Sequence, residues 1–214
     1  MQYSSYMKPT LYLLFAISIS DPLFAQSLDL PAPQKSGGMP LMDALAKRST
    51  AREFDPRELS SRQLSDLLWA SFGINRPDGK RTAPSAKNFQ ETDLYVVLKQ
   101  GTYLYDAKSN HLNLVVKGDL RSLAGTQAFA TNAPVTLVFI ADLGRMEKMS
   151  PEEKQNFAAI DVGYISQNAY LFCASEGLVT GARASVDRKA LGTKLQLRPD
   201  QKIILAQSVG YPAR

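Results

Sequence analysis

Cysteine and histidine are almost absent from this 214-residue sequence, which contains one of each. The single cysteine, Cys173, excludes an internal disulfide and any metal cluster held by cysteines. The single histidine, His111, leaves a histidine-based metal site without enough ligands, and no nucleophile elbow is present for Ser/His/Asp chemistry. We therefore expect no metal site, and the residues identify no catalytic acid, base or nucleophile.

A long block of like charge is also missing, although the formal net charge is +5 at neutral pH. Such a balance suits an anionic ligand but provides no continuous basic surface, so we expect no nucleic-acid partner. Apolar residues make up 44% of the chain and charged residues 21%, a composition typical of a soluble globular domain. The length is suited to one domain with one core.

Long apolar runs are lacking except near the N-terminus, where Lys8 precedes the run LYLLFAI at 11–17. This run is too short to span a bilayer, and the small residue Ala25 precedes Gln26, so residues 1–25 are predicted to be a signal peptide. A retained N-terminal anchor is the alternative. Cleavage would leave no stable membrane insertion, and we expect an exported protein of the periplasm or cell envelope.

The remaining chain is predicted to be a linker at 26–39, rich in proline, serine and glycine, followed by one domain at 40–214. Hydrophobic spacing predicts helices at 42–46, from Ser60, at 119–130 and from Pro151 to Gly177. Strands are predicted at 94–98, 103–105, 112–116, 135–141 and 203–206. Because strands and helices do not alternate strictly, the pattern favours an α+β fold over a doubly wound sheet.

Two short segments carry residues suited to a phosphorylated heterocycle. The segment RSTAR at 48–52 combines two arginine forks with two hydroxyls, which together match the oxygens of a phosphate. The loop APSAKN at 83–88 has small side chains that let the backbone approach a flat ring, and Asn88 offers a donor and an acceptor to a ring edge. Each segment alone is also compatible with an ordinary helix end or turn.

Taken in order, the segments of this chain resemble the nitroreductase family. The matching features are RSTAR at 48–52, LLWA at 67–70, APSAKN at 83–88, Gln127, the strand from Ala133, the helix segment 161–171 and the end VGYP at 209–212. The closest similarity is to the branch that resembles the dehydrogenase components of thiazole/oxazole-forming peptide synthetases. The resemblance implies a nitroreductase-like α+β fold, with a central mixed, mainly antiparallel sheet flanked by helices, in an intertwined homodimer.

The resemblance also implies a non-covalently bound FMN at the subunit interface. The residues that would bind it are Arg48, Ser49, Thr50, Arg52, Pro84, Ser85, Ala86, Asn88, Gln127, Ala184, Ser185 and Arg214. The first four and Arg214 would hold the phosphate and ribityl chain, and the loop 84–88 would come from the partner subunit. Gln127 would face the polar edge of the isoalloxazine, and the pair at 184–185 would pass beneath the ring near its N5.

The activity that this resemblance implies is that of an FMN-dependent oxidoreductase. It would transfer hydride or electrons between a donor such as NAD(P)H and a small organic acceptor, such as a nitro compound or a quinone. The flavin carries that chemistry, and the protein needs only to bind, orient and tune it. Two alternatives stay open: a protein that stores or remodels flavin, and a non-enzymatic interaction domain of the cell envelope.

Overall fold

One antiparallel sheet forms the centre of the molecule, in a computed structural model that describes residues 27–213. Its strands are β1 (Leu28–Asp29), β2 (Phe54–Asp55), β3 (Thr92–Leu98), β4 (Gly101–Asp106), β5 (His111–Lys117), β6 (Val135–Asp142), β7 (Val179–Arg183) and β8 (Gln201–Pro212). The order is β1-β5-β4-β3-β6-β8-β2, and β7 also pairs with β8. Each pairing between these strands is antiparallel.

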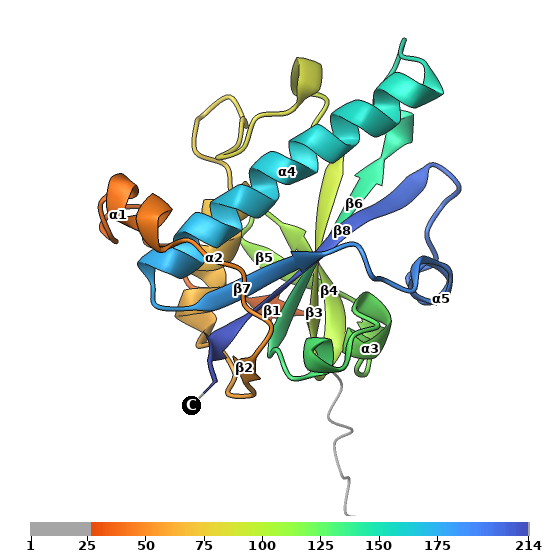
Figure 1. Ribbon diagram of the computed structural model, residues 1–214. Coiled ribbons are helices and arrows are strands. Elements are labelled where there is room, and N and C mark those ends of the chain that lie inside the picture. Colours follow the sequence, from red (N-terminus) through yellow and green to blue (C-terminus); the bar gives the residue numbers. More distant parts are fainter. Residues whose placement is uncertain (1–26, 214) are drawn as a thin grey trace, which may run out of the picture.

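Helices cover both faces of the sheet (Figure 1). They are α1 (Leu41–Lys47), α2 (Ser61–Phe72), α3 (Arg121–Ala124), α4 (Pro151–Ser175) and α5 (Arg188–Lys194), with the 3-10 turns η1 (Ala86–Asn88), η2 (Ala128–Thr131) and η3 (Leu143–Arg145). Helices α2 and α4 pack on one face, and α3 and α5 pack on the other. The predicted α+β architecture, a mainly antiparallel sheet flanked by helices, is therefore confirmed.

The two-sided burial of the sheet explains the continuous apolar runs of its central strands. In β3, Leu94 and Val96 lie in the core beneath α2 and α4, whereas Tyr95 and Val97 lie in the core beneath α3 and α5. Successive side chains of a strand point to opposite faces, so a strand covered on both sides needs apolar residues at every position. Every residue of β6 is buried for the same reason.

The ends of the two main helices follow the signals in the sequence. Ser60 caps α2 in a capping box with Gln63, as predicted, and Ser150 caps α4 in the same way. Gly177 lies just past the end of α4 with a φ of +67°, and the next residue donates a backbone hydrogen bond of 2.9 Å to the carbonyl of Cys173. A glycine in this left-handed conformation ends a helix without steric cost.

The predicted helix at 119–130 is wrong, because the structure has only α3, a break at Gly125 and then η2. A Cβ at Gly125 would lie 2.4 Å from both the Cβ of Ala130 and the Nε of Arg183. Only a residue without a side chain fits at this turn of the chain. Strand β7 and helix α5 were not predicted. The sequence of β7, VTGAR, has little apolar periodicity, and its pairing with β8 holds it in the sheet.

Residues 27–39, which the sequence analysis assigns to a linker, lie against the domain. Strand β1 pairs with β5, and the hydroxyl of Ser65 donates to the carbonyl of Pro31 at 2.6 Å. The backbone N–H of Met39 donates to the hydroxyl of Ser175 at 2.8 Å. The predicted signal peptide at 1–25 lies outside the described residues. Among residues 27–213, no helix combines the length and apolar character that crossing a membrane requires.

Candidate functional site

The segment 48–52 follows α1 and lies directly against β7. The backbone N–H of Ala51 donates to the carbonyl of Thr180 at 2.9 Å. A Cβ on Gly181 would lie 2.4 Å from the carbonyl oxygen of Ala51. This would be a steric clash, which a backbone oxygen cannot relieve by rotating away. The missing side chain at Gly181 therefore allows the arginine-rich segment to approach the strand this closely.

Tyr170, on α4, joins the same segment to the same strand. Its hydroxyl accepts a hydrogen bond of 2.8 Å from the backbone N–H of Ala182 and lies 3.1 Å from the hydroxyl of Thr50. The guanidinium of Arg48 lies over the tyrosine ring, 5.4 Å from its centroid. One side chain from the long helix therefore fixes the orientation of two residues that the sequence assigns to phosphate binding.

These elements enclose a cavity of about 310 Å³. Its lining residues are Thr50, Ala51, Arg52, Gln127, Phe129, Gly181, Ala182, Arg183, Ala184 and Ser185. The hydroxyl of Ser185 donates to the side-chain carbonyl of Gln127 at 3.1 Å, which ties the loop after β7 to the turn before η2. The structure thus brings five of the predicted site residues, from three distant parts of the sequence, around one space.

The predicted loop at 84–88 lies elsewhere on the chain. Pro84, Ser85 and Asn88 line a separate cavity of about 230 Å³ beside α2. Within one chain, these residues and the 48–52 segment share no cavity. The expectation that the two groups meet only when two subunits combine stays a prediction.

The loop at 84–88 has a strained backbone. Lys87, Asn88 and Gln90 have φ values of +49°, +57° and +47°, in a region that costs a non-glycine residue about 1–2 kcal/mol. The backbone N–H of Gln90 donates to the hydroxyl of Ser85 at 3.0 Å, and its side-chain amide donates to the side chain of Asn88 at 3.1 Å. Such strain is found most often at binding sites and is maintained by the surrounding contacts.

Two buried acids lie beneath this loop. The carboxylate of Asp161, on α4, accepts a hydrogen bond of 2.7 Å from the backbone N–H of Ala86. Glu91 is fully buried near Asp161, and burial raises the pKa of both carboxyls. The negative charge of Asp161 raises the pKa of Glu91 further, because like charges disfavour ionisation.

The remaining predicted residues have less to contribute in a single chain. Ser49 is exposed, Arg48 contacts Tyr170 rather than the cavity, and Arg214 lies outside the described residues. The site residues missed from the sequence include Tyr170, Gly181 and Arg183. The charge of Arg183 inside a strand was a usable signal, but β7 itself was not recognised.

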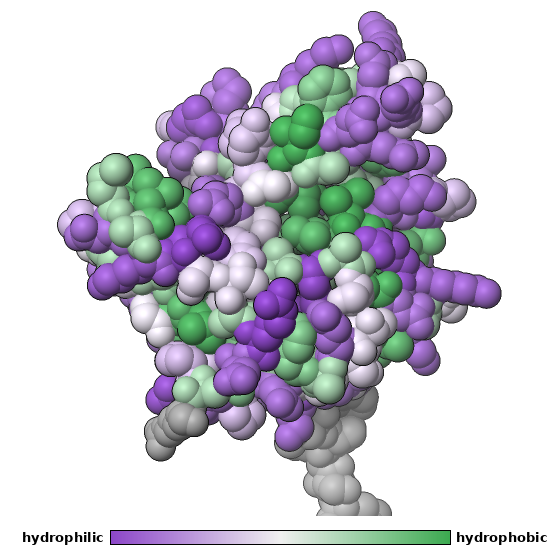
Figure 2. Space-filling view, in the orientation of Figure 1, coloured by the Kyte–Doolittle hydropathy of each residue, from purple (hydrophilic) through white to green (hydrophobic). Residues whose placement is uncertain are grey.

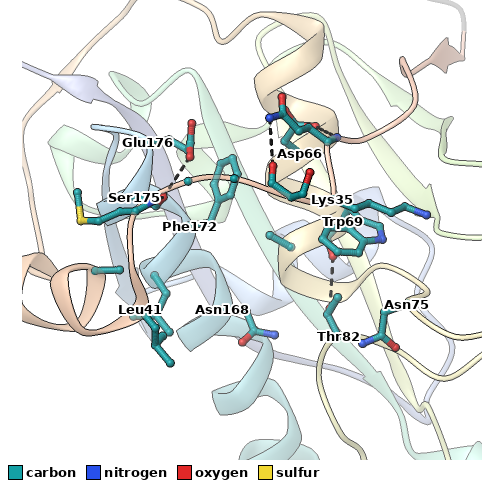
Figure 3. Close-up of a pocket in the computed structure, with 18 residues that line it drawn as sticks. Lys35, Leu41, Asp66, Trp69, Asn75, Thr82, Asn168, Phe172, Ser175 and Glu176 are labelled. Carbon is teal, nitrogen blue, oxygen red and sulfur yellow. Dashed lines mark hydrogen bonds between the residues drawn. The ribbon is translucent and has the colours of Figure 1, made fainter.

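A larger hollow of about 660 Å³ lies between residues 34–39, α1, α2 and α4 (Figure 3). Trp69 and Thr82 lie on one side of it, and Phe172, Ser175 and Glu176 lie on the other. None of the predicted cofactor-binding residues lines it. No group of three or more potential metal ligands occurs among residues 27–213.

The cavity beside β7 has the properties needed by FMN, which is flat, negatively charged and rich in acceptors. Arg52 and Thr50 supply positive charge and a hydroxyl, and the backbone around Gly181 leaves the wall free of bulky side chains. Arg183 also contributes to this wall, and its guanidinium, whose buried Nε has no hydrogen-bond partner, lies behind it. The residues present therefore fit the group that the sequence resemblance implies.

Comparison with known proteins identifies the family. The family described as the nitroreductase family matches residues 45–211. A crystal structure of a provisionally named nitroreductase from Ralstonia eutropha JMP134 is 43% identical, with a TM-score of 0.84, and the match covers 88% of this chain and 90% of that one. A provisionally named nitroreductase of Methanocaldococcus jannaschii is 29% identical over 150 residues, which are 65% of this chain and 76% of the relative.

More distant structures share the fold. The NADPH:FMN oxidoreductase of Vibrio harveyi, solved in complex with NAD⁺, is 19% identical with a TM-score of 0.60, and the match covers 81% of this chain and 69% of that one. Because the family match extends over most of the chain and includes the RSTAR segment and β7, the similarity covers the elements that form the cavity. The chain belongs to the nitroreductase family.

Proposed function

We propose that this protein is an FMN-dependent oxidoreductase that transfers electrons between a donor such as NAD(P)H and a small organic acceptor, such as a nitro compound or a quinone. The observation that carries the proposal is the convergence of Thr50, Arg52, Gln127 and Ser185 on one cavity in a chain of this family. FMN bound there would supply two-electron redox chemistry. The protein would supply binding, orientation and protection from water.

The residues of segment 48–52 would bind the phosphate. Arg48 and Arg52 each present a planar set of N–H donors, and Thr50 has a hydroxyl already held by Tyr170. Gln127 and Ser185 form a hydrogen-bonded pair in the same lining, where amide and hydroxyl groups could meet the polar edge of a heterocycle. No side chain lining the cavity is placed to act as an acid or base on a substrate.

A second copy of the chain would complete the site with its loop at 84–88. Large apolar side chains are exposed on α1 (Leu41, Met42 and Leu45) and on α4 (Phe157, Ile160 and Tyr164). Figure 2 shows apolar surface over α1 and along the line of α4. Gly163 lies three residues after Ile160 with nothing within 4 Å of its Cβ position, which would let another helix approach closely. We propose that this surface, the α1–α4 surface, forms the homodimer.

Two finer assignments also belong to the proposal. The similarity of the successive sequence segments supports a place nearest to the branch that resembles the dehydrogenases of thiazole/oxazole-forming peptide synthetases, and oxidation of a thiazoline-containing peptide would test that assignment. The apolar run at 11–17 supports export to the periplasm or envelope. Fractionation of the native host would test export, and recovery only from the cytoplasm would contradict it.

The binding assignment is tested by replacing Arg48 and Arg52 together with alanine. Loss of two charge-assisted contacts should weaken FMN binding on the order of a hundredfold or more, with the far-ultraviolet circular dichroism unchanged. The control replaces Lys189 and Lys194, two exposed lysines of α5, and should retain FMN. Retention of FMN by the arginine variant would reject the assignment. A wild-type protein that binds FMN but turns over neither nitroaromatics nor quinones with NAD(P)H would reject the proposed activity.

A further inference from the structure

Arg183 is a buried cation without a counterion. Only 7% of its surface is exposed, and it is the last residue of β7. Its guanidinium donates to the hydroxyls of Ser208 at 2.6 Å and Thr136 at 3.4 Å and to the carbonyl of Ala124 at 3.4 Å, while its Nε has no partner. None of the ion pairs among residues 27–213 includes it.

This arrangement differs from that of a partly buried arginine on α3. Arg121 pairs with the carboxylate of Asp119 at 2.7 Å, so its charge is neutralised by a counterion. Burial lowers the pKa of Arg183 to about 10, which still leaves it charged at neutral pH. A buried charge that lacks a partner is costly, and such charges are retained most often where they act on a ligand.

The position of Arg183 places its charge directly behind the wall of the proposed FMN cavity. Residues 181–185 contribute to that wall, and the guanidinium extends behind it to the carbonyl of Ala124 in α3. The Nε is so close to Gly125 that a Cβ there would lie 2.4 Å away. The side-chain nitrogens of Arg183 are enclosed by Ala124, Thr136 and Ser208, so they act on the cavity through space rather than by contact.

We propose that Arg183 is a positioning residue that stabilises the reduced, negatively charged form of bound FMN relative to the oxidised form. This inference rests on the proposed function. When FMN takes up two electrons and two protons, its ring stays neutral, whereas two electrons and one proton leave one negative charge on the ring. A fixed positive charge nearby favours the second outcome.

A role in binding the FMN phosphate predicts a different result. The phosphate has the same charge in oxidised and reduced FMN, so a cation that acts on it changes both affinities equally. The midpoint potential depends on the ratio of those affinities and would then stay constant. A purely structural role in linking β6, β7 and β8 would also leave the potential unchanged, so the potential separates these roles from the one proposed.

The experiment measures the midpoint potential of bound FMN against pH in the intact protein, with dithionite as the reductant. The variants are Arg183→Met, which removes the charge at similar volume, and Arg183→Lys, which keeps it. Arg121→Met is the matched control, because it removes a partly buried guanidinium whose charge Asp119 already neutralises. Free FMN is titrated in parallel.

We expect Arg183→Met to lower the ratio of the affinities for reduced and oxidised FMN about tenfold, which corresponds to a shift of about one pKa unit. For two electrons, a tenfold change lowers the midpoint potential by about 30 mV. Arg183→Lys and Arg121→Met should stay near the wild type. In the wild type, the pH at which proton uptake changes from two to one per electron pair should lie below that of free FMN. In Arg183→Met it should rise by about one unit.

Equal potentials in the wild type and Arg183→Met, or an equal fall in Arg121→Met, would overturn the inference. If Arg183→Met does not fold or does not bind FMN, the measurement on the wild-type protein tests the inference. The inference is overturned if FMN bound to the wild type changes from two protons to one per electron pair at the same pH as free FMN. Failure of the proposed function looks different, since the wild-type protein would then bind no FMN at all. In that case the inference is rejected along with the function.

Discussion

The RSTAR segment can lie against β7 because Gly181 has no side chain. The carbonyl oxygen of Ala51 lies 2.4 Å from the place where a Cβ of residue 181 would be. The backbone N–H of Ala51 is already hydrogen-bonded to the carbonyl of Thr180. The contact is therefore backbone against backbone, and neither partner can rotate away. The positions of Thr50 and Arg52 at the cavity depend on this approach.

Gly181→Ala should move the segment away from the strand. We expect a loss of about 1–3 kcal/mol in the free energy of unfolding, the usual cost of overpacking a close contact, and a clear fall in FMN affinity. Urea denaturation and FMN titration measure the two effects. Gly192→Ala, on α5, is the control, because its Cβ would meet only Leu197 at 3.8 Å. Unchanged FMN affinity in Gly181→Ala would show that the close approach is not needed for binding.

At the scale of elements, the strained loop after Thr82 depends on the acid pair beneath it. Asp161 reaches the backbone of Ala86 from α4, and Glu91 occupies the start of the connection to β3. One oxygen of Glu91 accepts from the hydroxyl of Thr92 at 3.2 Å, while its Oε2 is buried without a hydrogen-bond partner among residues 27–213. Burial favours the neutral form of both carboxyls.

This pair predicts that stability falls as the solution becomes more alkaline. Burial raises the folded-state pKa of Glu91 and Asp161 above their values in the unfolded chain. The stabilisation is thus fully present below the unfolded pKa, near 4, and is lost as the pH rises through the raised folded pKa. Free energies of unfolding measured by urea between pH 5 and about pH 9 should show this decline.

Glu91→Gln should flatten that decline, because it replaces one of the two buried carboxyls with an amide that does not titrate. Glu152→Gln, in the exposed first turn of α4, is the control and should leave the pH dependence of the wild type intact. If Glu91→Gln and the wild type lose stability in parallel as the pH rises, ionisation of Glu91 does not cause the decline.

On the scale of the whole molecule, the two halves of the proposed FMN site lie in separate cavities of one chain. The α1–α4 surface offers the apolar residues with which a second copy could join them. A dimer formed there would combine the segment 48–52 of one chain with the loop 84–88 of the other. Dimer formation and FMN binding should therefore depend on each other.

Ile160→Glu should disrupt both. Ile160 is 49% exposed in the single chain, so a charge there costs the folded monomer little but would be buried in a dimer. We expect sedimentation velocity to show a monomer and FMN affinity to fall at least tenfold. Val115→Glu, an exposed apolar position on β5, is the control and should leave both properties unchanged. A monomeric Ile160→Glu protein with full FMN affinity would contradict the shared site.

Local signals explain why much of this fold could be predicted. Alternating or continuous apolar residues marked β3 to β6, and the serine caps and Gly177 marked the ends of α2 and α4. These signals act within a few residues, so a sequence displays them directly. Strand β7 and the break at Gly125 have no such signal, because pairing with β8 and crowding by Arg183 arise only after folding.

The same distinction applies to the site. The sequence by itself determined which side chains at 48–52 are suited to a phosphate and that the loop at 83–88 has small residues, because guanidinium and hydroxyl chemistry is a property of the residues. Only the tertiary structure decided that Tyr170 holds Thr50, that Gly181 admits Ala51, and that the charge of Arg183 is buried without a counterion. Burial and pairing depend on what surrounds a residue in space, and those neighbours come from distant parts of the chain.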